Sequence, residues 1–163
     1  MVQKTNDIRV RLMADSDLAA VNDIDRSIAG KGRVTTWPFS FETYWGIYKP
    51  EAIVFVAELN GQVTGFLSGY IEQRKRSKSL FERPHEVDHS GSEERIGWIE
   101  MMGIRPEAWH KGIGTRLLDA FRAECKKRNA KIRIVARDDD GDLASFLRSA
   151  GFKKSETVTY ELP

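Results

Sequence analysis

The amino-acid sequence predicts a mixed α/β (α+β) fold with one central sheet, and two patterns carry this prediction. In the first half, an apolar run at 53–57 is followed by Asn-Gly at 60–61, the strongest short signal of a β-hairpin. In the second half, strand-like segments at 96–104 and 132–136 enclose an amphipathic helical segment at 112–128. Such a β-α-β unit places its two strands parallel in one sheet, with a right-handed crossover.

Alternation and capping signals place the elements of the first half. Ile8, Val10 and Leu12 alternate with polar residues, as in a half-buried strand. Asp15 or Ser16 is suited to cap the helix that follows. The expected elements are a strand at 8–12, a helix ended by Gly30, a short helix within 38–48, and strands at 53–57 and 63–71.

The second half alternates strands with amphipathic helices. It begins after a polar, aperiodic stretch at 73–95. An apolar stripe at helical spacing runs from Ile113 to Cys125, and a shorter stripe ends at Gly151, a residue type common at helix C-termini. The expected elements are a strand at 96–104, a helix at 112–128, a strand at 132–136, a short helix at 143–150 and a last strand at 157–162.

Length and composition fit one soluble domain spanning residues 1–163. The net charge of +2 gives no compositional argument for nucleic acid, and no apolar window is long enough for a membrane helix. The polar N-terminus lacks the apolar core of a signal peptide, and Cys125 is the one cysteine of the chain. We therefore expect a cytoplasmic protein without disulfides, and neither nucleic acid nor a membrane as its partner.

The turn at 109–114 carries the clearest chemical signal. Gly112 and Gly114 let the backbone approach a ligand closely, and the helix that begins there presents unpaired N–H groups with partial positive charge. This combination favours a phosphate or diphosphate. The turn is not a dinucleotide fingerprint, because Leu117 stands where the third glycine belongs, and it lacks the Gly-Lys-Ser/Thr of a P-loop. The alternative is a glycine-rich turn without a ligand.

Two longer segments resemble a known family. Residues 98–118 (WIEMMGIRPEAWHKGIGTRLL) are similar to motif A of the GCN5-related N-acetyltransferases (GNAT), and residues 146–152 (FLRSAGF) resemble the Gly-Phe ending of its motif B. The resemblance implies a mostly antiparallel central sheet of six to seven strands, with a splayed parallel pair and about four flanking helices. It also implies acetyl-CoA as co-substrate and no metal cofactor.

In this family the pantetheine arm lies in the gap between the splayed strands, and the diphosphate lies at the turn. Trp109 stands where the family has Gln or Arg, so we expect the diphosphate to be held mainly by backbone N–H groups and Lys111. The cofactor-binding residues that the resemblance implies are Met102, Gly103, Ile104, Trp109, His110, Lys111, Gly112, Ile113, Gly114, Thr115 and Asp140.

The implied reaction moves an acetyl group directly to a primary amine within a ternary complex. Glu100 is the candidate general base, where many family members carry a glutamate, and apolar neighbours are expected to raise its pKa. Regular alternation would point Glu100 to the same strand face as Met102 and Ile104. A backbone N–H near Gly103 or Ile104 is the expected oxyanion donor. The alternative is an exposed strand glutamate without a role.

The general acid is left open. The family's tyrosine is Leu147 here, a residue that also fits the apolar stripe of a core helix. Either the thiolate leaves unprotonated, the catalytic rate is low, or another group such as Tyr44, Tyr48 or Tyr70 assists.

Two other functions compete with acetyl transfer. The first is a non-catalytic acyl-CoA-binding module, suggested by Trp109 and Leu147. The second is a zinc hydrolase, because His85, Glu86 and His89 match His-Glu-x-x-His, although Pro84 and the following Ser-Gly-Ser disfavour a helix there. The acceptor amine, whether a small molecule or a protein or peptide, is not specified, and a homodimer is compatible with the family.

Overall fold

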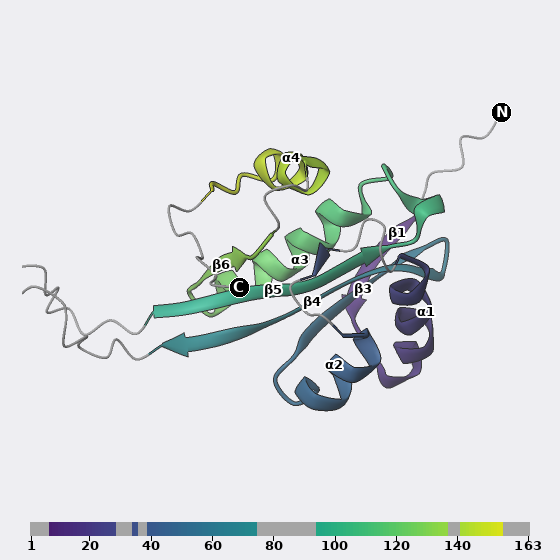
Figure 1. Cartoon of the computed structure of the whole chain (residues 1–163), viewed down its shortest axis with the longest axis horizontal. Coiled ribbons are helices and arrows are strands. Elements are labelled where there is room, and N and C mark those ends of the chain that lie inside the picture. The colour runs from purple at the N-terminus through teal and green to yellow at the C-terminus, as the bar shows by residue number, and fades with distance from the viewer. Residues whose placement is uncertain (1–6, 29–33, 36–38, 75–93, 137–140, 155–163) are drawn as a thin grey trace, which may run out of the picture.

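The computed structural model describes residues 7–28, 34–35, 39–74, 94–136 and 141–154. Within these ranges a twisted sheet is covered by helices on both sides (Figure 1). The strands are β1 (Ile8–Leu12), β2 (Val34–Thr35), β3 (Ile53–Leu59), β4 (Gln62–Arg74), β5 (Glu94–Ile104) and β6 (Ala130–Ile134). The helices are α1 (Leu18–Ile28), α2 (Phe41–Tyr48), α3 (Ile113–Lys127) and α4 (Gly141–Ser149). None of the described helices is long and apolar enough to cross a membrane.

The sheet is antiparallel except for one parallel pair. β1, β3, β4 and β5 follow one another as antiparallel neighbours, and β6 pairs parallel with β5. β4 pairs along one edge of β5. On the other edge, β6 pairs with residues 95–99 and the short β2 pairs with Met101 and Met102. The pairing of β5 with β6 stops at Ile99, although β5 continues to Ile104. The parallel pair is therefore hydrogen-bonded only along its first part.

These elements confirm the mixed α/β fold expected from the sequence. The strands expected at 8–12, 53–57, 63–71 and 96–104 are present, with β4 and β5 longer than expected, and the strand expected at 132–136 begins and ends two residues earlier. Asn60 and Gly61 both have the positive φ of the expected turn. α1 begins at Leu18, after a 3-10 turn at Asp15–Asp17. The two-residue β2 was not predicted, since so short a strand has no periodicity to detect. The strand expected at 157–162 lies outside the described residues.

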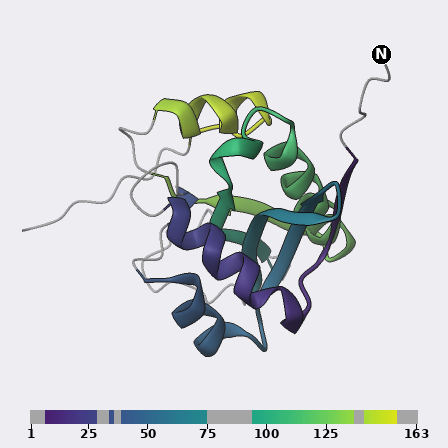
Figure 2. The same ribbon diagram turned by 90° about the vertical axis from the view of Figure 1, so that its right-hand side faces the viewer.

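The two faces of the sheet carry separate cores. α1 and α2 cover one face, and α3 covers the other, with α4 beside it (Figures 1 and 2). The core under α3 is formed by Ala57, Leu67, Ile99, Met102, Ala108, Ile113, Leu117, Leu118, Phe121 and Cys125. The core under α1 and α2 is formed by Val21, Ile24, Ile28, Phe41, Tyr44, Val54, Val56, Phe66 and Met101.

α3 packs directly against the backbone of β4 and β5. A Cβ at Gly97 would lie 2.4 Å from Cys125 Sγ, and one at Gly69 would lie 2.8 Å from Phe121 Cζ. Both distances are shorter than real Cβ contacts allow, so glycine at these positions lets Phe121 and Cys125 sit on the sheet. This close packing fixes where α3 begins relative to the end of β5.

Candidate active site

The connection between β5 and α3 is a tightly folded turn. Arg105 precedes a 3-10 turn at Pro106–Ala108, and His110 then adopts a left-handed φ of 60°. Gly112, the N-cap residue of α3, has a φ of 79°, in a region where residues with a Cβ are strained. No side chain of the described residues caps this helix, and the N–H groups of its first turn are suited to bind a ligand.

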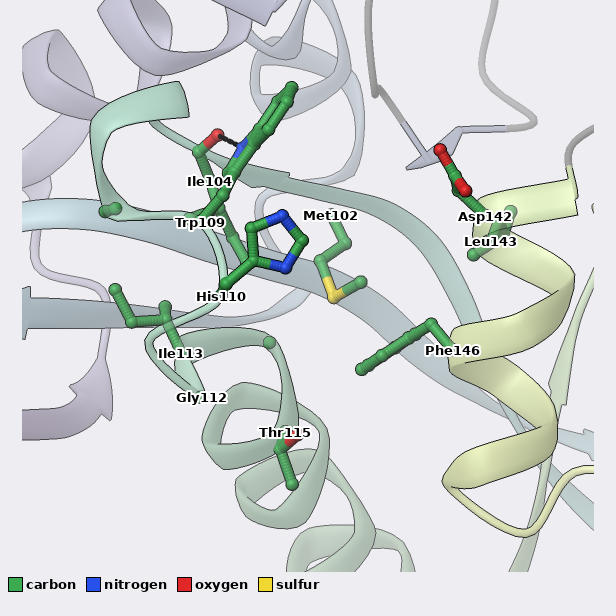
Figure 3. Close-up of a pocket in the computed structure, with 12 residues that line it drawn as sticks. Met102, Ile104, Trp109, His110, Gly112, Ile113, Thr115, Asp142, Leu143 and Phe146 are labelled. Carbon is green, nitrogen blue, oxygen red and sulfur yellow. Dashed lines mark hydrogen bonds between the residues drawn. The ribbon is translucent and has the colours of Figure 1, made fainter.

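A pocket of about 400 Å³ lies between the end of β5, the start of α3 and α4 (Figure 3). Its walls are mostly apolar, with the first turn of α3 on one side and the aromatic ring of Phe146 on the other. A Cβ at Gly114 would come within 3.3 Å of Ile104 Cδ1 and 3.5 Å of Phe146 Cζ. The lining residues are Met102, Ile104, Ala108, Trp109, His110, Gly112, Ile113, Gly114, Thr115, Asp142, Leu143 and Phe146.

Most of the residues proposed from the sequence to bind the cofactor line this pocket. They are Met102, Ile104, Trp109, His110, Gly112, Ile113, Gly114 and Thr115. Gly103 is not among the lining residues, and a Cβ there would point to Ile28 and Phe66 on the opposite face. Lys111 Nζ donates a hydrogen bond to the Glu107 carbonyl oxygen at 2.9 Å, so its ammonium is held outside the pocket wall. Asp140 lies outside the described residues.

α4 contributes to the pocket, and the sequence did not predict this. Asp142, Leu143 and Phe146 come from this helix, which follows the glycine turn by about thirty residues. The apolar stripe of α4 predicted a buried side, but it did not show that this side faces a cavity. Leu147 is half-buried, and it is not among the described side chains that pack against either core.

Trp109 forms a specific contact at the mouth of the pocket. Its indole Nε1 donates a hydrogen bond to the Ile104 carbonyl oxygen at 2.8 Å, drawn as a dashed line in Figure 3. The ring is 40% exposed and lines the pocket. The contact ties the turn to the last residue of β5.

A β-bulge determines where Glu100 points. In the pairing of β4 with β5, Ser68 is opposite Met101 and Gly69 is opposite Ile99, so Glu100 is an extra residue without a partner on β4. Ile99 and Met102 both belong to the core under α3, whereas Met101 belongs to the core under α1 and α2. The bulge interrupts the alternation, and the expectation that Glu100 shares a face with Met102 and Ile104 was wrong.

Glu100 therefore faces α2, on the side of β5 opposite the pocket. Burial raises the pKa of its carboxyl group, and the Tyr44 side chain partly offsets this effect. Burial also raises the pKa of Tyr44, while the Ser68 side chain acts in the opposite direction. A partly desolvated carboxylate is suited to accept a proton.

A family model described as the acetyltransferase (GNAT) family matches residues 18–152. The chain belongs to this family. It is therefore an acetyltransferase that transfers an acetyl group from acetyl-CoA to an amine nitrogen, as motif A of the sequence implied. The matched range includes the turn, the pocket and Glu100.

Solved structures of other acetyltransferases share the fold of this one. Aminoglycoside N-acetyltransferase AAC(6')-Iy in complex with CoA is 14% identical, with 100% of this chain and 99% of that chain covered and a TM-score of 0.71. An aminoglycoside 6'-N-acetyltransferase from Acinetobacter haemolyticus is 17% identical, with 95% and 97% covered and a TM-score of 0.67. A protein from Clostridium acetobutylicum described as a predicted acetyltransferase, solved with acetyl-CoA, is 19% identical, with 96% of each chain covered and a TM-score of 0.67. No curated protein matches the sequence.

Two other groups of this acetyltransferase bear on its chemistry. Cys125 lies on the buried face of α3, and burial raises the pKa of its thiol to about 11, which makes it a poor nucleophile. The described residues contain no cluster of His, Cys, Asp and Glu able to hold a metal. The His85–His89 motif lies outside them.

Proposed function

We propose that this acetyltransferase moves the acetyl group directly to a primary amine, with both substrates bound at once and with Glu100 as the general base. The observation that carries the proposal is the arrangement around β5. The pocket for the co-substrate lies on one face of this strand, and the partly desolvated carboxylate of Glu100 lies on the other. An amine arriving on the Glu100 side would meet the thioester at the edge of β5.

The pocket residues fit coenzyme A. The uncapped first turn of α3, at Ile113–Thr115, offers backbone N–H groups and the positive end of the helix dipole to a diphosphate. Gly114 leaves open the space between Ile104 and Phe146 that a side chain would enter. The part of β5 beyond Met102, where pairing with β6 and with β2 has stopped, is the edge that we assign to the pantetheine arm. Acetyl-CoA supplies the activated acetyl group.

Glu100 would remove the proton that the amine must lose. Attack by the amine nitrogen forms the C–N bond, the C–S bond breaks, and the leaving sulfur keeps the electron pair. The ammonium proton passes to the Glu100 carboxylate, directly or through a water. A cysteine relay is disfavoured, because Cys125 is the one cysteine of the chain and is buried with a raised pKa. Direct transfer is the route that remains.

We further propose a small cationic amine as the acceptor. Glu72 lies with Glu100 on the face covered by α2, and the Trp98 indole Nε1 donates to Glu72 Oε2 at 2.9 Å. Two carboxylates on one face attract a cation. The solved structures that resemble this chain include aminoglycoside acetyltransferases, whose acceptors are polycationic small molecules. These observations support a small polyamine over a protein lysine.

Two measurements test the proposal. Titration calorimetry with acetyl-CoA should show binding without any amine, and no heat from a folded sample at high micromolar ligand would contradict the assigned pocket. A screen of acetyl-CoA consumption should then compare aminoglycosides, polyamines and lysine peptides. Turnover on the peptides alone would overturn the proposed acceptor class.

A non-catalytic acyl-CoA-binding module is the second candidate, favoured by Trp109 and Leu147 at positions where the family has polar side chains. Such a module would bind acetyl-CoA in the calorimeter but consume none with any amine of the panel. Turnover that is lost in Glu100→Gln would exclude it.

A further inference from the structure

The indole of Trp109 is bonded to a backbone group at the edge of β5 that faces away from β4. Arg105 N donates to the Thr64 carbonyl oxygen on β4 at 2.8 Å. Because the backbone groups of successive residues in a strand point to alternate edges, those of Ile104 point to the other edge. The Ile104 carbonyl oxygen, which accepts from Trp109 Nε1 at 2.8 Å, therefore lies on the edge that we assign to the pantetheine arm.

This contact spans more of the turn between β5 and α3 than the backbone bonds within it. Ala108 N donates to the Arg105 carbonyl oxygen at 2.9 Å, and Trp109 N donates to that of Pro106 at 3.2 Å. These two bonds join residues three apart and close the 3-10 segment on itself. The indole bond reaches back five residues to Ile104, so it fixes the end of this segment to the sheet.

The residues after Trp109 have a strained backbone. His110 has a φ of 60° and Gly112 a φ of 79°, and of these two only His110 carries a Cβ. Among the described residues, His110 takes part in no backbone hydrogen bond. A residue with a side chain keeps such a conformation only where its surroundings impose it. Trp109, bonded to Ile104, fixes one end of this segment, and α3, packed on the sheet, fixes the other.

We propose that Trp109 is a positioning residue that fixes the diphosphate-binding turn through the Ile104 carbonyl group. This inference rests on the assignment of the pocket to coenzyme A. Figure 3 shows the indole directed back to Ile104, whereas the N–H groups that we assign to the diphosphate belong to the first turn of α3. Trp109 therefore acts on the diphosphate through the backbone of the turn and not by direct contact.

The test compares kcat/KM for three acetyl thioesters in Trp109→Phe, which keeps an aromatic ring but removes the N–H donor. Acetyl-CoA carries the diphosphate, acetyl-phosphopantetheine carries a single phosphate in its place, and acetyl-pantetheine carries no phosphate. Loss of one hydrogen bond that orders the turn should lower kcat/KM by about threefold to tenfold for the two phosphorylated thioesters. The value for acetyl-pantetheine should not change.

The ratio of kcat/KM between the thioesters distinguishes positioning from a loss of folded protein, which lowers all three values equally. An unchanged ratio in Trp109→Phe would overturn the proposal. A loss confined to acetyl-CoA would also overturn it, because it indicates direct contact with the nucleoside. Tighter binding of acetyl-CoA would mean that the indole competes with pantetheine for the Ile104 carbonyl group, which is the opposite role.

Failure of the proposed function has a different outcome. If the unmodified protein binds no acetyl-CoA in the calorimeter, the pocket assignment fails, and this inference fails with it. If the unmodified protein binds and turns over acetyl-CoA but Trp109→Phe has the same thioester ratio, only the role of Trp109 fails.

Trp45→Phe is the matched control. It makes the same substitution on α2, where the Trp45 ring stacks on Phe41 at 6.1 Å, on the face of the sheet opposite the pocket. Any effect of this variant should be equal for the three thioesters, so their ratio should match that of the unmodified protein. A change of ratio as large as that in Trp109→Phe would contradict the proposal.

The indole N–H resonance of Trp109 provides a second measurement, which does not depend on the folding of a variant. A hydrogen-bonded N–H exchanges with solvent more slowly than the N–H of an indole exposed to water. We expect slow exchange of this proton in the unmodified protein, both without ligand and with acetyl-CoA bound. Exchange that becomes faster when acetyl-CoA binds would mean that the ligand breaks the contact, and it would contradict the proposal.

Discussion

At the scale of single residues, the burial of the Glu100 carboxyl group favours its proposed role as a base but makes the folded protein less stable as the pH rises. Its carboxyl group is partly desolvated between β5 and α2, and burial raises its pKa. A folded-state pKa above that of the unfolded chain means that the folded protein holds this proton more tightly. Stability therefore falls as the pH rises from the unfolded pKa to the folded one. The same desolvation makes the carboxylate a better base.

Glu100→Gln should separate these two effects. Without the carboxylate, kcat/KM for the amine should fall by about 10²–10⁴-fold, the usual contribution of a general base. The neutral amide also removes the cost of ionisation, so the melting temperature at pH 8 should exceed that of the unmodified protein. Kinetics and thermal melts at pH 4 and pH 8 check both points. A variant that is less stable at pH 8 but fully active would contradict both roles.

At the scale of elements, the start of α3 is shaped by two glycines with different functions. Gly112 supplies the left-handed backbone of the N-cap, and a Cβ there would meet nothing within 4 Å. Gly114 has ordinary backbone angles, but its missing side chain keeps the pocket open between Ile104 and Phe146. The left-handed backbone of Gly112 therefore sets the direction in which α3 begins, and the missing side chain of Gly114 leaves space for the ligand.

Gly114→Ala should weaken binding of acetyl-CoA with little loss of stability. The added methyl group would make ordinary contact with Phe146 and would need only a small shift of the Ile104 side-chain end at 3.3 Å, yet it would occupy ligand space. We expect KM for acetyl-CoA to rise about tenfold, equivalent to about 1.4 kcal/mol. Gly46→Ala on α2, where a Cβ meets nothing within 4 Å, is the control and should leave this KM unchanged. An equal KM in both variants would argue against the assigned pocket.

Gly97→Ala, at the contact between α3 and the sheet, should instead destabilise the fold. A Cβ there would lie 2.4 Å from Cys125 Sγ and 3.3 Å from Phe121, so α3 would have to move away from β5. Gly97→Ala should lower the free energy of unfolding by about 1–3 kcal/mol, as overpacking commonly does. Denaturant unfolding measures this loss. Gly97→Ala combined with Cys125→Ala, which removes the clashing sulfur, should recover part of it.

At the scale of the whole molecule, the sequence predicted the fold well and the site in part. The fold followed from strong local signals, such as Asn60-Gly61, whose two positive φ angles form the expected turn. The orientation of Glu100 did not, because an extra residue in one strand leaves no mark on the hydrophobic pattern. α4 was expected as an element but not as a pocket wall, since contacts between distant segments depend on how layers pack.

Removing metal ions from the whole protein tests the zinc-hydrolase alternative. If the His85–His89 motif held a functional zinc ion, exhaustive chelation would abolish activity and His89→Ala would lose the metal. The pocket and Glu100 need no metal for acetyl transfer, so we expect chelation to leave turnover with acetyl-CoA unchanged. Elemental analysis alongside the assay distinguishes an absent metal from one that resists removal.

The bulge at Glu100 also has a consequence for how specificity can change. Because the bulge turns the proposed base away from the assigned coenzyme pocket, the proposed amine site and the coenzyme pocket belong to different layers of the molecule, built from different helices. If the amine binds in the layer of α1 and α2, as proposed, mutations there would alter which amine is accepted without disturbing the coenzyme layer. The acceptor could then change in evolution while the co-substrate stays the same.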